Sequence, residues 1–103
     1  MRGLPLRPVV EREGTFIPAV QRGYAADPTF KKILAAPEAH DRFTLHGELI
    51  TTRNRAGDDV LCVPATLHGK RRLTEIVIDL AHSMLGHFGP QKTADYIRRF
   101  YWW

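Results

Sequence analysis

The sequence predicts an α+β domain with short N-terminal helices, a three-stranded antiparallel β-meander, and then two helices joined at a sharp corner. Helical periodicity in the first third of the chain gives way to alternating and β-branched residues over 42–63. Helical periodicity then returns from Leu73. At 103 residues, of which 44% are hydrophobic, the chain is expected to form one small domain, or one domain with an arm.

The first segment, residues 1–14, combines prolines, glycines and charges, so we expect a mobile arm that buries little. A short helical turn is expected over 18–23, between a proline and a glycine. A clearer helix follows Asp27, which is a good N-cap, and Pro28 fits the first helical position. Pro37 is expected to end this helix. Its apolar face comprises Phe30, Ile33 and Leu34.

The middle of the chain predicts three strands. Residues 43–45 alternate between apolar and polar, and a histidine–glycine corner leads into a β-branched run over 48–52. A turn cluster over 54–58 then precedes a buried-type strand over 59–63. Cys62 lies in this third strand, where we expect a small buried hydrophobe rather than a nucleophile or a metal ligand.

The last part of the chain predicts a helix–corner–helix unit, preceded by a basic loop over 68–72. An amphipathic stripe indicates a helix over 73–85, and Gly86 suits the position after its end. Pro90 opens a second helix, expected over 90–101. The aromatic residues at the end of the chain are too many for a solvated tail, so they must pack on the body or on a partner. The stripe of the first helix comprises Leu73, Ile76, Val77, Leu80, Ala81 and Met84.

Charge and composition restrict the function classes. The formal net charge is +4 and the pI is near 9.6, which is compatible with nucleic-acid binding. A single cysteine forms no intramolecular disulfide and favours a reducing compartment. No apolar stretch approaches the roughly 18 residues of a membrane-spanning helix, and prolines and arginines interrupt residues 1–8, where a secretory signal is apolar. We therefore expect an intracellular protein with no membrane association.

Two histidines straddle the predicted corner. A bend at Gly86 would turn the imidazoles of His82 and His87 towards each other. Imidazole is a standard zinc ligand, so this pair would be half of a tetrahedral site, and two ordinary polar residues at a helix end are the alternative. No glutamate follows His82, so the pattern is not that of a zinc protease. Because no motif of nucleophilic or carboxylate catalysis occurs, no catalytic residue is predicted.

The stretch LAHSMLGHFGPQKT over 80–93, followed by YIRRFYWW over 96–103, closely resembles the H-H-C-C zinc-binding domain at the start of integrases. The resemblance is to integrases of gypsy-type long-terminal-repeat retrotransposons. It extends upstream, because residues 16–66 resemble the extension that precedes that domain. It thus divides the chain into a flexible arm (1–14), an extension with helix and β-meander (15–66), and half of a zinc-binding domain (67–103).

This resemblance implies that His82 and His87 are zinc ligands. In the family a C-x-x-C pair follows the aromatic residues, and the sequence stops at Trp103 before such a pair, so it supplies only a half-site. Cys62 is too early and too strand-bound to replace these cysteines. We therefore expect zinc to be absent or weakly held in this chain, and bound in the full-length protein if later residues supply the thiolates.

The resemblance also implies a non-catalytic role, because the three magnesium-binding carboxylates of the integrase core have no counterpart here. We expect a nuclear module that assists DNA integration and integrase assembly, with DNA and other integrase chains as partners. The alternative is a truncated or domesticated remnant that acts as a protein-interaction domain without zinc. A helix-turn-helix regulator fits less well, because the second helix is rich in aromatic residues. The candidate phosphate-contacting residues are Lys70, Arg71, Arg72, Lys92, Arg98 and Arg99.

Overall fold

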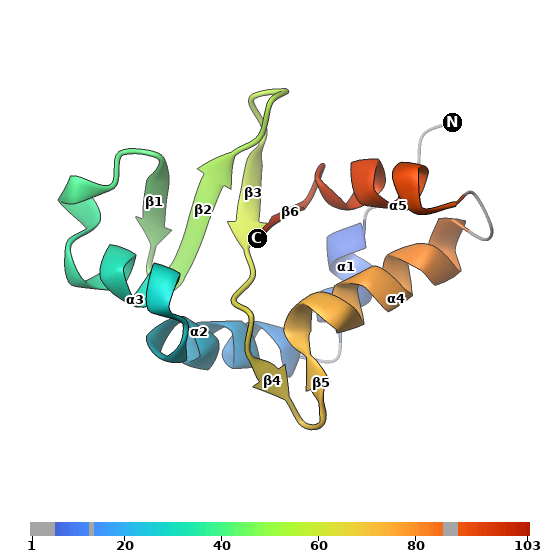
Figure 1. Ribbon diagram of the computed structural model, residues 1–103, viewed down its shortest axis with the longest axis horizontal. Helices are drawn as coiled ribbons and strands as arrows, with labels where there is room; N and C mark the ends of the chain where they lie inside the picture. Colours follow the sequence, from blue (N-terminus) through green and yellow to red (C-terminus); the bar gives the residue numbers. More distant parts are fainter. Residues whose placement is uncertain (1–5, 13, 86–88) are drawn as a thin grey trace.

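A computed structural model describes residues 6–12, 14–85 and 89–103, and its α+β architecture confirms the predicted fold class (Figure 1). None of the described helices is both long and apolar enough to cross a membrane. In chain order the elements are α1 (Leu6–Glu11), α2 (Phe16–Ala26), α3 (Pro28–Ala35), the 3-10 helix η1 (Pro37–Ala39), β1 (Phe43–His46), β2 (Leu49–Arg53), β3 (Asp59–Cys62), β4 (Leu67–His68), β5 (Arg71–Arg72), α4 (Leu73–Leu85), α5 (Pro90–Ile97) and β6 (Tyr101–Trp102).

The predicted meander is confirmed, and a fourth strand extends it. β1, β2 and β3 pair antiparallel in sequence order, and the two-residue corner between β1 and β2 contains Gly47 at a φ of 65°. β6 joins the sheet beside β3 in the parallel direction, with Leu61 opposite Tyr101 and Cys62 opposite Trp102. The end of the chain therefore lies in the middle of the molecule, between the meander and α5 (Figure 1).

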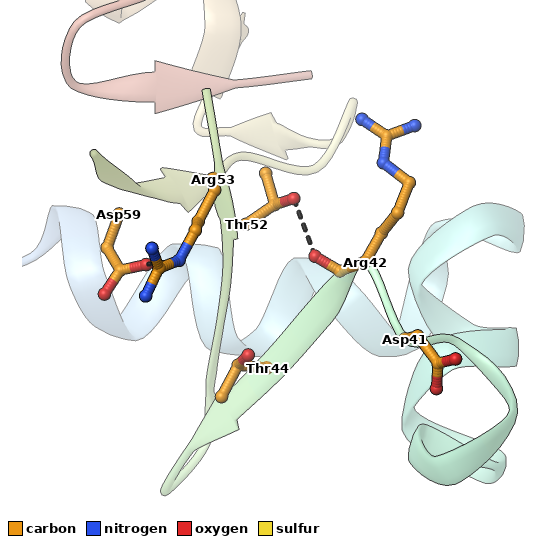
Figure 2. A pocket seen from close by; sticks show the side chains of 6 residues that line it. All are labelled: Asp41, Arg42, Thr44, Thr52, Arg53 and Asp59. Carbon is orange, nitrogen blue, oxygen red and sulfur yellow. Dashed lines mark hydrogen bonds and ion pairs between the residues drawn. The ribbon is translucent and has the colours of Figure 1, made fainter. Parts of the chain in front are cut away.

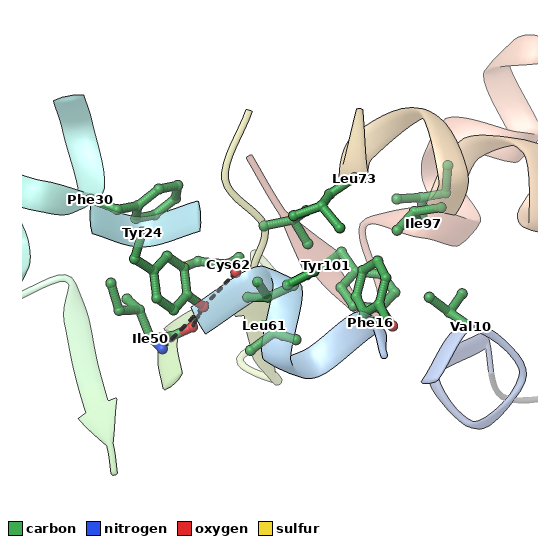
Figure 3. Packing of buried hydrophobic residues seen from close by; sticks show 14 of the residues in the cluster. Val10, Phe16, Tyr24, Phe30, Ile50, Leu61, Cys62, Leu73, Ile97 and Tyr101 are labelled. Carbon is green, nitrogen blue, oxygen red and sulfur yellow. Dashed lines mark hydrogen bonds between the residues drawn. The ribbon is translucent and has the colours of Figure 1, made fainter. Parts of the chain in front are cut away.

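Tyr24 holds the sheet together from α2. The antiparallel pairing of β2 with β3 runs from Arg53 to Thr51, and at the next position the Tyr24 hydroxyl bridges the two backbones. This hydroxyl donates to the carbonyl oxygen of Cys62 at 2.7 Å and accepts from the amide of Ile50 at 3.2 Å (Figure 3). Burial raises the pKa of Tyr24 far above its usual range, so the hydroxyl keeps its proton.

Asp27 caps α3 as predicted and also makes a tertiary contact that the sequence does not show. One carboxylate oxygen accepts from the amides of Thr29 and Phe30 at 2.9 and 3.3 Å, which satisfies two free donors of the first helical turn. The other accepts from the amide of Ala65 at 2.9 Å. Asp27 therefore joins the start of α3 to the chain that leaves β3.

α2 is longer than the predicted turn over 18–23, because Gly23 does not end it. A Cβ atom added at Gly23 would lie 2.6 Å from Cγ of Pro64 and closer still to Oγ1 of Thr66. The glycine therefore serves a close approach between the helix and the chain after β3, and not a helix end. Pro18 is tolerated because it lies in the first turn, where its missing amide costs no helical hydrogen bond.

Residues 6–11, expected to lie in an arm that buries little, instead form α1, which packs against α4. Val10 is buried in the core, and Glu11 accepts a 2.6 Å hydrogen bond from the hydroxyl of Tyr101. Arg7 pairs with the same carboxylate at 2.7 Å, so one turn of helix satisfies the charge of Glu11. Of the rest of the predicted arm, residues 1–5 and 13 lie outside the described residues.

The predicted second helix over 90–101 is too long. α5 ends at Ile97, a turn follows, and Tyr101 and Trp102 form β6. Pairing with β3 overrides helical periodicity here, because the amides of Leu61 and Val63 donate to the carbonyls of Phe100 and Trp102 at 3.1 and 2.9 Å. Of the two alternatives for the aromatic end, packing on the body holds for Tyr101 and in part for Trp102, whereas Trp103 is exposed.

The basic loop predicted over 68–72 is a hairpin of β4 and β5 that leads directly into α4. α4 itself has the predicted bounds, and Leu73, Val77 and Ala81 of its stripe are fully buried. These residues join a single hydrophobic cluster that includes residues from α1, α2, the sheet and α5. Phe16 of α2 packs edge-on against Tyr101 with ring centroids 6.1 Å apart, near Val10 (Figure 3).

Candidate functional site

The predicted histidine pair is only partly within the described residues. His82 lies near the end of α4 and is exposed, outside the buried stripe of that helix. His87, and the bend expected at Gly86, lie outside the described residues. The convergence of the two imidazoles therefore stays a prediction.

The described residues do not fit a closed zinc site. No three histidine, cysteine, aspartate or glutamate side chains among them gather closely enough to hold a metal ion. Cys62 is fully buried in β3, which confirms its predicted role as a small hydrophobe, and burial raises the pKa of its thiol to about 12. Since zinc binds the thiolate, Cys62 is a poor ligand at neutral pH. Of the two predicted histidine ligands, His82 is the one that lies within the described part of the chain.

The three candidate cations of the β4–β5 hairpin are exposed, but their charges are not equally available. Arg71 lies 3.6 Å from the carboxylate of Glu75 and also pairs with Asp79, two turns along α4. These pairs partly neutralise the cation that would meet the N-terminus of the helix. Lys70 at the hairpin turn and Arg72 on β5 remain exposed cations of this surface.

Arg98 and Arg99 lie in the turn after α5. The segment between α5 and β6 is distant from the hairpin of β4 and β5 (Figure 1). Arg98 pairs with Asp95 at 3.2 Å, and its backbone carbonyl accepts a 3.1 Å hydrogen bond from the side-chain amide of Asn54. Asn54 also accepts at its side-chain oxygen from the amides of Ala56 and Asp58, each at 3.0 Å. Asn54 thus organises the β2–β3 turn and fixes it against the turn after α5.

That contact creates a groove that neither segment forms alone. It has a volume of about 1070 Å³ and runs between the β2–β3 turn, α4, α5 and the end of the chain. His82 and Asp95 line it from the two helices. Its walls carry five arginines, from both halves of the chain: Arg42, Arg53, Arg55, Arg98 and Arg99. We call this feature the arginine groove.

A smaller pocket of about 250 Å³ lies beside β1 and β2, and its charges are balanced. Arg53 reaches across to Asp59, with the charged atoms 3.7 Å apart, whereas the guanidinium of Arg42 extends away from that pair (Figure 2). Asp41 provides the second carboxylate. With two cations and two anions, this pocket offers no charge excess to an ionic ligand.

The structure therefore separates the six predicted cations into a hairpin group and an α5 group. Lys92 is exposed on α5, while Arg98 and Arg99 line the arginine groove. Sequence reasoning missed Arg42, Arg53 and Arg55, because they lie at or beside strand ends and follow no periodicity of their own. The only local indication was the turn cluster over 54–58, whose role in joining the two halves depends on the fold.

Residues 70–103 match the family model of the integrase zinc binding domain. This match confirms, for the last third of the chain, the resemblance to an integrase zinc-binding domain. Comparison with curated proteins and with solved structures yields no match. The C-terminal third, comprising part of the hairpin, α4, α5 and β6, is therefore an integrase-related module.

Proposed function

We propose that this chain is a non-catalytic module of a gypsy-type retrotransposon polyprotein that contacts DNA phosphates and assists integration in the nucleus. The match of residues 70–103 to the integrase zinc binding domain is the observation that supports this proposal most strongly. The exposure of all six candidate cations also supports it, because phosphate contacts need side chains that reach the DNA backbone. Other integrase chains are the second class of partner in this proposal.

Duplex DNA binding across a salt series tests this function. Contacts to phosphates release counterions, so the logarithm of the binding constant should fall linearly with that of the salt concentration, with a slope near −0.9 per contact. A double variant, Arg98→Ala with Arg99→Ala, should flatten this slope by about 1 to 2. The control pairs Arg12→Ala with Arg22→Ala, two exposed arginines outside the groove.

A flat salt profile in the unmodified chain would refute phosphate binding and favour the remnant with a protein-interaction role. An equal loss in both double variants would show that only total charge matters, and not the place of Arg98 and Arg99.

We propose further that this chain alone binds zinc weakly or not at all, with His82 and His87 as half of a ligand set. The support is that a structural zinc site needs four ligands, and the described residues supply His82. Thermal unfolding should then be insensitive to stoichiometric zinc. A rise in the unfolding midpoint that is lost in His82→Ala would show instead that the chain completes a site.

A further inference from the structure

The arginine groove joins the segment matched by the integrase family to the segment before it. Arg98 and Arg99 come from the matched segment, whereas Arg42, Arg53 and Arg55 come from the earlier one. The 3.1 Å hydrogen bond from Asn54 to the carbonyl of Arg98 brings these two sets together, since Asn54 stands between two of the arginines in sequence. The groove therefore requires the two segments to be folded against each other.

The charge of the groove is strongly one-sided. Its five arginines face one lining carboxylate, Asp95, a formal excess of four positive charges that equals the excess of the entire chain. Arg98 pairs with Asp95, and Arg53 pairs with Asp59 from the neighbouring pocket. The remaining three arginines form no salt bridge with any carboxylate of the described residues: Arg42, Arg55 and Arg99.

Aromatic side chains lie among these cations. Trp103 lines the groove and is 45% exposed, although large aromatic residues are usually covered. Trp102 beside it is half-buried, and the guanidinium of Arg42 stacks over its ring at 5.5 Å. The groove therefore combines guanidinium groups with an indole side chain that the described part of the chain covers only in part.

We propose that the arginine groove binds a single strand of nucleic acid, with an unpaired base stacked on Trp103 and phosphates held by Arg42, Arg55 and Arg99. Cationic grooves with interspersed aromatic residues suit single strands, because every base has a stacking face and every link carries a negative charge. A duplex keeps its bases stacked inside and presents no face to Trp103. An acidic peptide would use the arginines but not the indole.

This inference depends on the proposed function only in requiring a nucleic-acid ligand, and the two are separable by experiment. The probes are a fluorescein-labelled oligothymidine strand of about 12 nucleotides, the same backbone without bases, and a blunt duplex of similar length. Fluorescence anisotropy gives the affinities. The two tryptophans of the chain, Trp102 and Trp103, give an intrinsic signal that a stacked base should quench.

The single strand should bind more tightly than the abasic strand and quench tryptophan fluorescence to saturation. Trp103→Ala should weaken single-strand binding by about fivefold or more, the low end of base stacking, and leave duplex binding unchanged. Trp103→Phe should retain part of the affinity. Arg55→Ala should weaken binding of the oligothymidine strand and of the abasic strand alike. Arg22→Ala, outside the groove, should have no effect.

Circular dichroism of each variant establishes that the fold is kept, which is expected because Trp103 and Arg55 are exposed. Duplex binding with no preference for the single strand, and no effect of Trp103→Ala, would overturn this inference and leave the proposed function standing. Absence of binding to all three probes would overturn both. Polyglutamate that competes fully, with Trp103→Ala silent, would assign the groove to an acidic peptide and overturn this inference alone.

Discussion

The segment matched by the integrase family and the segment before it contribute to the core in different ways. The earlier segment closes on itself, because Tyr24 joins β2 to β3 and Asp27 joins α3 to the chain after β3. The matched segment relies on its neighbour, since α4 packs on α1 and α2, and β6 pairs with β3. The unit that folds is therefore larger than the unit that the family match delimits.

This comparison also explains where the candidate site lies. A groove built from two segments can form only at their junction, and the junction here is made by β6 and by the contact between Asn54 and Arg98. The hairpin group of cations belongs to the matched side alone, and Arg71 is there paired with Glu75 and Asp79. Arg42, Arg55 and Arg99, which form no salt bridge among the described residues, lie where the two segments meet.

The largest expected effect comes from breaking the junction at Tyr101. Tyr101→Ala removes a fully buried ring that packs on Phe16, so unfolding should become easier by about 3–5 kcal/mol. That is a large share of the roughly 5–15 kcal/mol by which such domains are stable. Urea unfolding measures the loss, with Trp103→Ala as the exposed aromatic control. A change below about 1 kcal/mol would mean that the two segments do not share a core.

Replacing a tyrosine by phenylalanine, once within the earlier segment and once at the junction, sharpens the comparison. Tyr24→Phe leaves the buried Ile50 amide and Cys62 carbonyl without their bridge, a loss of about 1–3 kcal/mol. Tyr101→Phe should cost about 1 kcal/mol, because Glu11 keeps its pair with Arg7. Urea unfolding of the two variants in parallel decides the order. A larger loss for Tyr101→Phe would place the stronger polar contact between the segments and not within the earlier one.

The sequence predicted the earlier segment better because its signals are local. The Asp27-Pro28 cap, the glycine corner before β2 and the alternation over 43–45 each determine structure within a few residues. β6 was missed because Tyr101 and Trp102 become a strand only through β3, about forty residues earlier. Gly23 was misjudged as a helix end for the same reason, since its role depends on Pro64. The groove, which depends on the Asn54–Arg98 contact, followed from no local pattern.

The smallest expected effect concerns Cys62, which lies in the earlier segment and pairs across the junction with Trp102. Burial raises the pKa of its thiol from 9.0 to about 12, so between these values the unfolded chain loses a proton that the folded chain keeps. This contribution to stability is present below about pH 9 and is lost as the pH rises towards 12, and the loss reaches about 0.8 kcal/mol at pH 9.5.

Cys62→Ala lacks this proton, so its unfolding free energy should fall less steeply than that of the unmodified chain between pH 8 and pH 10. Tyr24 and Tyr101, whose pKa values burial also raises, are present in both proteins, and their contributions cancel in the comparison. In the folded chain the thiol should also resist alkylation at neutral pH until urea exposes it. Rapid alkylation without urea would show that the Cys62 thiol is reachable in the folded chain and would contradict its burial.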